Sequence, residues 1–308
     1  MKISIVTPTY NEIDNIKNLY LDIKKIMNDL NIDYEHIIID NLSYDGTIEL
    51  IKEIAKEDYN VKVIINSKNY GHIRSPFYGV LQSSGDATIL MASDYQDPPH
   101  LIVDLIEKWR KGSKIVLTQK INSEENQFIY FLRKTYYKFV NYISENKLTE
   151  NTTGSGIFDK SVIKQLKDID DPYPYFRGLI NEISEEVATI KFNQPLRKYG
   201  KTKNNLFTLY DTALLGIVKH SRKPLRMKTF IGLTFSLISF LIGIFYLFYK
   251  IIFWDTFSVG VAPIIIGMFF FGSFQILLLG LVGEYVGIIL LHQRKMPLVV
   301  EKERINFN

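Results

Sequence analysis

The sequence has 308 residues, with 37 lysine and arginine residues against 33 aspartate and glutamate residues, so its formal net charge is +4. It contains no cysteine, which excludes disulfide bonds, a thiolate nucleophile, a cysteine-ligated zinc site and iron–sulfur clusters. The mean hydropathy of +0.01 is high for a chain with 23% charged residues, because a charged first part is joined to an apolar later part.

The first two hundred residues alternate between short β-rich runs and helical patterns. The β-rich runs lie at 3–7, 36–39, 61–65, 88–91 and 115–117, and the helical patterns lie at 14–30, 47–56 and 101–111. Strands that alternate with helices predict parallel βαβ units and an α/β sheet. We interpret the Gly-Ser-Gly sequence at 154–156 as a turn near a site.

Polar segments follow three of these predicted strands. They read TPTYNE at 7–12, DNLSYDGT at 40–47 and ASDYQDPP at 92–99. Ligands of open α/β sheets bind beyond the carboxyl ends of the strands. The three segments together therefore predict a binding site at that edge of the sheet.

The third polar segment has the donor atoms of a divalent cation site. Asp94, Gln96 and Asp97 place three oxygen-bearing side chains within four residues, directly after an apolar strand. Mg²⁺ and Mn²⁺ prefer carboxylate, carbonyl and phosphate oxygens. For Asp97 the alternative, that it caps the helix beginning near His100, stays equally open.

The first two polar segments and one basic segment carry groups suited to a nucleotide. Asp40 ends a predicted strand, where its carboxylate can accept hydrogen bonds from a base or a ribose, and Glu12, two residues beyond Tyr10, can accept one from a ribose hydroxyl. Arg197, in the basic segment RKYGKTK, has the forked donor group that grips phosphate oxygens. The alternative for that segment is a loop of solvated charges.

The apolar later part predicts membrane insertion. Residues 229–249 and 256–283 contain no charged side chain, and about 20 apolar helical residues cross a bilayer. Ten basic residues and one acidic residue lie between 191 and 228, and such positive flanks stay in the cytoplasm. Aromatic and basic stretches at 128–143 and 205–219 favour helices lying in the membrane interface. Buried core helices are the alternative for the two runs, and a basic strip this local argues against nucleic-acid binding.

The order of these motifs resembles that of a known family. TPTYNE, the Asp40 region, NYG at 69–71, SDYQDPP, PYFRGL at 174–179, RKYGKTK and GLVGEYVG at 280–287 look like the family 2 polyprenol-phosphate glycosyltransferases over nearly the whole chain. The resemblance implies an α/β fold: a GT-A (nucleotide-sugar-binding, Rossmann-like) domain followed by two C-terminal transmembrane helices. The implied boundaries are 1–203 for the cytoplasmic GT-A catalytic domain, 204–228 for an amphipathic juxtamembrane segment, 229–291 for two transmembrane helices with a short external loop, and 292–308 for a cytoplasmic tail.

The resemblance also implies an activity, a cofactor and a set of site residues. The activity is inverting transfer of a sugar from a UDP- or GDP-sugar to a polyprenyl phosphate, such as undecaprenyl phosphate, at the cytoplasmic face of the inner membrane. The cofactor is Mg²⁺ or Mn²⁺, the bilayer is a partner, and homo-oligomerisation is left open. The implied roles are nucleotide binding by Pro8, Tyr10, Glu12, Asp40 and Lys203, metal binding by Asp94 and Gln96, catalysis by Asp94 and Arg197, and lipid phosphate binding by Arg133.

Two positions depart from the pattern of this family. Ala92 and Gly154 stand where the family usually has acidic residues, which leaves the donor sugar and any catalytic base open. A degenerate transferase that binds nucleotide and scaffolds a membrane assembly is therefore one alternative. A processive polysaccharide synthase is another, although neither Trp109 nor Trp254 lies in the Gln-x-x-Arg-Trp motif of those enzymes.

Overall fold

The computed structural model describes residues 1–121, 152–169, 171–184, 186–195, 261–294 and 296–307, with isolated positions between 234 and 253. Three predicted site residues, Arg133, Arg197 and Lys203, lie outside the described residues. So do both predicted interface stretches, the juxtamembrane segment 204–228, and most of the first predicted transmembrane run.

The described strands form one eight-stranded sheet in the order β7-β5-β6-β4-β1-β2-β3-β8. The strands are β1 (Lys2–Thr9), β2 (Asp33–Asp40), β3 (Val61–Asn66), β4 (Ala87–Leu90), β5 (Ile115–Lys120), β6 (Thr152–Asp159), β7 (Ala188–Phe192) and β8 (Glu301–Ile305). The helices are α1 (Ile13–Asp29), α2 (Thr47–Glu57), α3 (Gly71–Leu81), α4 (Leu101–Arg110), α6 (Lys160–Lys167), α7 (Phe176–Ile183) and α10 (Val261–Gln293).

Helices cover both faces of the sheet and bury its apolar side chains. On one face, Leu19 and Ile23 of α1 and Ile102 of α4 pack against Ile3 and Ile5 of β1. On the other face, helices α3, α6 and α7 pack against β1, β2, β4 and β6 through a second buried cluster. Burial on both faces explains why the central strands read as continuous apolar runs.

The predicted α/β sheet is confirmed, and its parallel character is right for the central part. Strands β4, β1, β2 and β3 are parallel neighbours, and all five predicted strands and three predicted helices are present. Strand β5 runs in the same direction as β4 but is not its neighbour, because the antiparallel strand β6, which was not predicted, lies between them. The result is a mixed sheet.

The interpretation of residues 154–156 as a turn is wrong, since these residues lie inside β6. Gly156 pairs with both Leu90 and Leu117, and a Cβ atom built on it would lie 2.3 Å from the backbone oxygen of Val116. Glycine therefore allows a close approach of two strands here, where the sequence pattern favoured a turn.

We expect Gly156→Ala to destabilise the fold by about 3 kcal/mol, because backbone atoms must move to admit the methyl group. Gly112→Ala is the control, since a Cβ atom there meets nothing within 4 Å and only the φ of +104° is unfavourable. We expect about 1 kcal/mol for that change. Urea unfolding of both variants measures the difference, and equal losses would contradict the close-approach argument.

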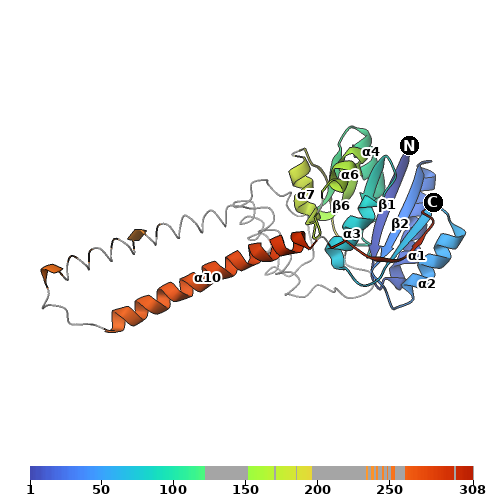
Figure 1. The fold of residues 1–308 in the computed structure, drawn as a ribbon. Helices are drawn as coiled ribbons and strands as arrows, with labels where there is room; N and C mark the ends of the chain where they lie inside the picture. The colour runs from blue at the N-terminus through green and yellow to red at the C-terminus, as the bar shows by residue number, and fades with distance from the viewer. Residues whose placement is uncertain are drawn as a thin grey trace.

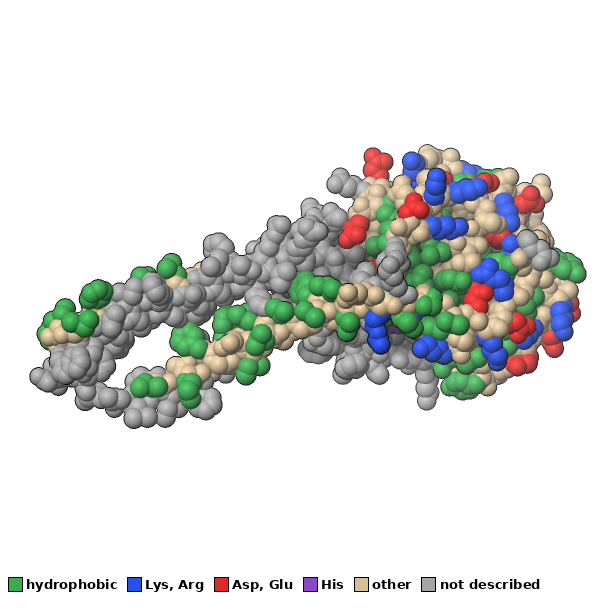
Figure 2. Space-filling view, in the orientation of Figure 1, with side chains coloured by type: hydrophobic (Ala, Val, Ile, Leu, Met, Phe, Trp, Pro, Cys, Tyr) green, Lys and Arg blue, Asp and Glu red, His purple; other side chains and the backbone are tan. Residues whose placement is uncertain are grey.

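Helix α10 projects away from the globular body (Figure 1). Many of its described side chains are large, apolar and exposed, such as Ile264, Met268, Ile276 and Ile289, whereas charged side chains gather over the globular body (Figure 2). Among the residues that the structure describes, no helix has both the length and the apolar composition needed to cross a membrane. The two predicted transmembrane helices are not supported by these residues.

The predicted tail contains a strand of the sheet. Residues 301–305 form β8, which pairs antiparallel with β3 through Val63↔Ile305 and Ile64↔Arg304. Four of the five residues of β8 are charged, so its sequence lacks the pattern of a strand. Charged side chains are common on edge strands because they oppose pairing with other chains.

Candidate active site

The structure brings the three polar segments to one edge of the sheet. The strand register places Thr9 beside Asp40, and the Asn41 amide N–H donates to the Thr9 carbonyl at 3.0 Å. On the other side of β1, the Met91 amide donates to the Val6 carbonyl at 3.0 Å. The predicted residues Pro8, Tyr10, Glu12, Asp40, Asp94 and Gln96 therefore all lie at or just beyond the carboxyl ends of β1, β2 and β4.

Glu12 is largely buried where β1 passes into α1. Its carboxylate accepts a hydrogen bond from the Asn15 side chain at 2.7 Å, and its amide donates to the Thr47 hydroxyl at 3.1 Å. The Asp45 carboxylate accepts from the Ile13 amide at 3.2 Å and from the Thr47 hydroxyl at 2.6 Å. These bonds hold the start of α1 against the start of α2.

Asp40 is fully buried and orders its own loop. The Ser43 amide donates to one carboxylate oxygen at 2.7 Å, and the Ser43 hydroxyl donates to the other at 2.6 Å. Burial raises the pKa of Asp40, although the hydrogen bonds from Ser43 act in the opposite direction. The Ser43 hydroxyl also accepts from the Asn11 amide at 2.7 Å, so Asp40 fixes the position of both polar loops.

An aromatic pair lies over these loops. The rings of Tyr10 and Tyr44 meet edge to face with centroids 6.2 Å apart, and Tyr44 is 82% exposed. Its amide donates to the Asn11 side chain at 2.9 Å. An exposed aromatic face that is fixed through its backbone is suited to stacking on a planar base.

Asn41 connects the loops of three strands. Its side-chain oxygen accepts from the Asn66 side chain at 2.9 Å and from the Tyr70 amide at 3.2 Å. Its side-chain nitrogen donates to the Gly71 carbonyl at 3.3 Å. Together with the bond to Thr9, these contacts make Asn41 the junction of the β1, β2 and β3 ends.

The loop after β4 presents the predicted metal ligands. Asp94 and Gln96 are both partly exposed, and the Gln96 amide donates to the Asp94 carboxylate at 3.1 Å. Tyr95 between them has a φ of +61°, which bends the loop sharply. One carboxylate and one amide oxygen, both reachable from solvent, fit a hard cation that takes further oxygens from a diphosphate or from water. In the described part of the chain, no three His, Asp or Glu side chains cluster as a metal site.

Asp97 has a different place from Asp94. It is buried, and its carboxylate accepts a hydrogen bond from the Ser155 hydroxyl of β6. Helix α4 begins at Leu101 with His100 in the N-cap position, so the interpretation of Asp97 as a helix cap is wrong. Asp97 instead ties the loop after β4 to the neighbouring strand.

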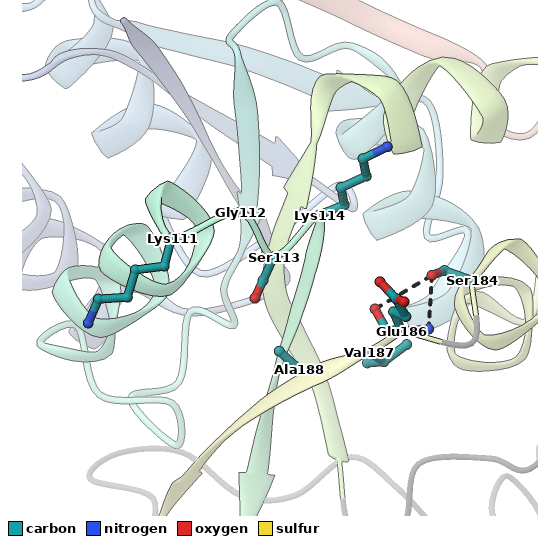
Figure 3. Close-up of a pocket in the computed structure, with 8 residues that line it drawn as sticks. All are labelled: Lys111, Gly112, Ser113, Lys114, Ser184, Glu186, Val187 and Ala188. Carbon is teal, nitrogen blue, oxygen red and sulfur yellow. Dashed lines mark hydrogen bonds between the residues drawn. The ribbon is translucent and has the colours of Figure 1, made fainter.

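A cavity of about 580 Å³ lies at the opposite edge of the sheet (Figure 3). It is lined by residues 111–114, which precede β5, and by Ser184 and residues 186–188, which precede and begin β7. Because β5 and β7 run parallel to β4, this is the amino-terminal edge of the sheet. The cavity is therefore separate from the candidate site.

Sequence reasoning gave no role to several residues at the carboxyl edge of the sheet, chiefly Asn41, Ser43, Tyr44 and Tyr70, although they lie in the motifs DNLSYDGT and NYG. All of them follow strand ends, which is the one signal that the sequence offered. Their roles depend on contacts between loops that are far apart in the chain, as the Asn41–Tyr70 bond illustrates.

Comparison with known proteins gives relatives that match along nearly the whole chain. The chain is 30% identical over 307 residues to the bactoprenol glucosyl transferase of Shigella phage SfX, covering 99% of this chain and 100% of the relative. It is 30% identical to the prophage bactoprenol glucosyl transferase homolog of Escherichia coli, covering 98% and 99%. An uncharacterized glycosyltransferase of Synechocystis, sll0501, is also 30% identical, with 97% and 94% covered.

Solved structures share the fold at lower identity. Glucosyl-3-phosphoglycerate synthase from Mycobacterium tuberculosis in complex with phosphoglyceric acid matches with a TM-score of 0.51 and 18% identity, covering 70% of this chain and 77% of that one. The same enzyme in complex with Mn²⁺, UDP-glucose and phosphoglyceric acid matches with a TM-score of 0.50 and 17% identity, at the same coverage. These matches support the GT-A α/β fold.

The family model for glycosyl transferase family 2 matches residues 4–167, more than half of the chain. These residues contain the strands and loops that build the candidate site. The predicted resemblance is therefore confirmed, and the chain belongs to glycosyl transferase family 2.

Proposed function

We propose that this protein transfers a sugar from a nucleotide sugar to a polyprenyl phosphate at the cytoplasmic face of a membrane. The observation that carries the proposal is the 30% identity, over the full length of both chains, to a bactoprenol glucosyl transferase. The polar edge formed by the ends of β1, β2 and β4 supports it, because that edge provides side chains for a nucleotide and for a cation.

The proposed donor site begins with the loops that Asp40 and Glu12 fix. Both carboxylates are buried and hydrogen-bonded to neighbouring residues, so each positions a loop before any ligand arrives. The exposed ring of Tyr44, in contact with Tyr10, is placed to stack on the base of a UDP- or GDP-sugar. Direct contacts of Pro8, Tyr10, Glu12 and Asp40 with the nucleotide are part of this proposal.

Asp94 and Gln96 are the proposed ligands of Mg²⁺ or Mn²⁺. A bound cation of this kind neutralises negative charge on a leaving diphosphate. Arg197 and Lys203 would bind phosphate oxygens and Arg133 the lipid phosphate, and these three roles rest on the sequence alone. Positive groups around both phosphates stabilise the charge of the reacting complex.

The acceptor needs no carboxylate base. The second pKa of a phosphate monoester is about 6, so its oxygen is already largely anionic at neutral pH. Gly154, where an acidic residue was expected, is therefore compatible with transfer. A single displacement by this oxygen inverts the anomeric centre, and the site needs only to align the two substrates.

Attachment to the membrane is the second part of the proposal. The exposed apolar side chains of α10 and the charge-free runs at 229–249 and 256–283 are suited to contact with hydrocarbon. Insertion of these runs would place the candidate site next to a lipid acceptor. Crossing the membrane twice, and assembly into a homo-oligomer, stay predictions.

A transfer assay tests the function. Full-length protein in detergent receives radiolabelled UDP-glucose, MnCl₂ and undecaprenyl phosphate, and a parallel reaction receives radiolabelled GDP-mannose. We expect label to move into the organic phase with at least one donor, only when the lipid phosphate is present. Donor binding without lipid labelling would instead support the scaffold alternative.

A further inference from the structure

The loop between β3 and α3, together with the first turn of α3, is held at two points by the segment that follows α10. The Ser67 amide donates to the Val300 carbonyl at 2.8 Å. In the first turn of α3, the Arg74 guanidinium donates to the Pro297 carbonyl. Residues 67–74 are therefore clamped by residues 297–300, which we call the return segment.

The same loop reaches the candidate site. The Tyr70 amide donates to the Asn41 side chain at 3.2 Å, and Asn41 donates back to the Gly71 carbonyl at 3.3 Å. Asn41 directly follows Asp40 and is bonded to Thr9 at the end of β1. A shift of Tyr70 would therefore move the junction on which the proposed nucleotide site depends.

Arg74 links the return segment to Tyr70. Its guanidinium lies 5.0 Å from the centre of the Tyr70 ring, and the Lys68 ammonium lies 5.1 Å from the same centre. Both are cation–π distances. The Nε atom of Arg74 is buried and has no hydrogen-bond partner among the described residues, so the Pro297 carbonyl and the Tyr70 ring are the contacts that orient this side chain.

The chain directly after the return segment is fixed independently of Arg74. β8 pairs with β3, and the Asn306 side chain donates to the carbonyls of Ala55 and Val61 at 2.7 and 2.8 Å. Lys52 of α2 forms an ion pair with Glu303. The segment is thus anchored beyond residue 300, while α10 ends at Gln293, just before Pro297.

We propose that Arg74 is a positioning residue that couples the end of α10 to the nucleotide site, through the return segment and the Tyr70–Asn41 bond. This inference rests on the proposed function of the site. The coupling is reciprocal: if the return segment favours the nucleotide-binding conformation of the loop, nucleotide must in turn stabilise the return segment. A displacement of α10 in the membrane would then change donor affinity.

The test compares Arg74→Ala and Arg74→Lys with the control Lys52→Ala. The control removes another positive side chain that contacts the segment after α10, in this case through Glu303 of β8. Full-length protein in detergent is titrated calorimetrically with UDP-glucose in MnCl₂. We expect Arg74→Ala to weaken binding about ten-fold, Arg74→Lys to recover most of the loss, and Lys52→Ala to stay within about two-fold of the wild type.

Hydrogen exchange supplies a second measurement. If Arg74 had only a structural role, its loss would not change how strongly UDP-glucose slows amide exchange in the segment after α10. UDP-glucose should slow exchange of the amides at 67–71 and 296–305 in the wild type, and should no longer slow those at 296–305 in Arg74→Ala. Without ligand, the amides at 67–71 should exchange faster in Arg74→Ala than in Lys52→Ala.

The outcomes separate the two proposals. If the wild type binds no tested nucleotide sugar, the proposed function fails, and the ligand-free exchange still tests whether Arg74 positions residues 67–71. Unchanged exchange at 67–71 in Arg74→Ala would overturn the inference. So would equal weakening of nucleotide binding by Lys52→Ala and Arg74→Ala, since the effect would then come from general loosening of the segment.

Discussion

Replacing Asp94 with alanine should lower the rate of sugar transfer at least about a hundred-fold, the size expected when one group that stabilises reacting charge is lost. Asp94 is the partly exposed carboxylate in the loop after β4, whereas Asp97 is buried against Ser155. Without Asp94, Gln96 alone offers one neutral oxygen to a cation. The measurement is the initial rate of lipid labelling at saturating donor.

Asp104→Ala is the matched control, because Asp104 is an exposed carboxylate on α4 and its loss changes the net charge equally. It should transfer sugar at nearly the wild-type rate. Titration with Mn²⁺ followed by electron paramagnetic resonance should show weaker binding by Asp94→Ala alone. Wild-type transfer by Asp94→Ala would remove the metal assignment.

Glu35→Gln should destabilise the fold by about 3 kcal/mol at pH 7, the usual cost of breaking a buried ion pair. The Glu35 carboxylate is 2% exposed and lies 2.8 Å from the ammonium groups of both Lys2 and Lys62. It also accepts from the Ser84 amide at 2.7 Å. Burial acts to raise the pKa of Glu35, but the hydrogen bonds from Lys2, Lys62 and Ser4 outweigh it and lower the pKa to about 2.

The lowered pKa of Glu35 determines how the stability of the protein depends on pH. A carboxyl group with a lowered pKa in the folded state stabilises the protein above its ordinary pKa of 4.5, and this contribution is lost as the pH falls toward about 2. The stability difference between wild type and Glu35→Gln should therefore shrink between pH 4.5 and pH 2. Urea unfolding followed by Trp109 fluorescence in a Trp254→Phe background measures it.

The exposed residue Glu57, at the end of α2, provides the comparison. Glu57→Gln should change stability by no more than about 0.5 kcal/mol at any pH in this range. A constant difference between wild type and Glu35→Gln down to pH 2 would contradict the assigned pKa. Such a result would mean that the substitution lowers stability through altered packing, and that titration of the Glu35 carboxyl does not contribute to the difference.

The sequence was informative where local pattern and tertiary burial agree. The apolar run of β1 and the amphipathic pattern of α1 were predicted because both faces of β1 and one face of α1 are buried. Helix α3 was not predicted, because Gly71 at its start and Pro76 inside it are signals for turns. In the fold, Gly71 adopts a φ of +80°, and packing of Phe77 and Val80 in the core stabilises the helix despite the proline.

The sequence predicted where the candidate site lies on the sheet, but it did not predict the hydrogen bonds between the loops that form the site. Strand ends identified the edge of the sheet along which Glu12, Asp40 and Asp94 lie. The sequence could not indicate that the Asp40 carboxylate accepts a hydrogen bond from Ser43. Nor could it indicate that the Asn41 side chain accepts one from the amide of Tyr70, 29 positions later. Those contacts depend on strand order, and no local pattern of residues encodes the neighbour of a strand across the sheet.

The pairing of β3 with β8 has a consequence for synthesis of the protein. Val63 leaves the ribosome long before Ile305, its partner in the sheet. At about 5–20 residues per second, the delay is roughly 10 to 50 seconds. During this interval one edge of the nascent sheet is uncovered, and uncovered edges invite pairing with other polypeptides. We therefore expect premature termination within the apolar region to yield an aggregation-prone fragment, even though the strands that bear the transferase motifs would already be complete.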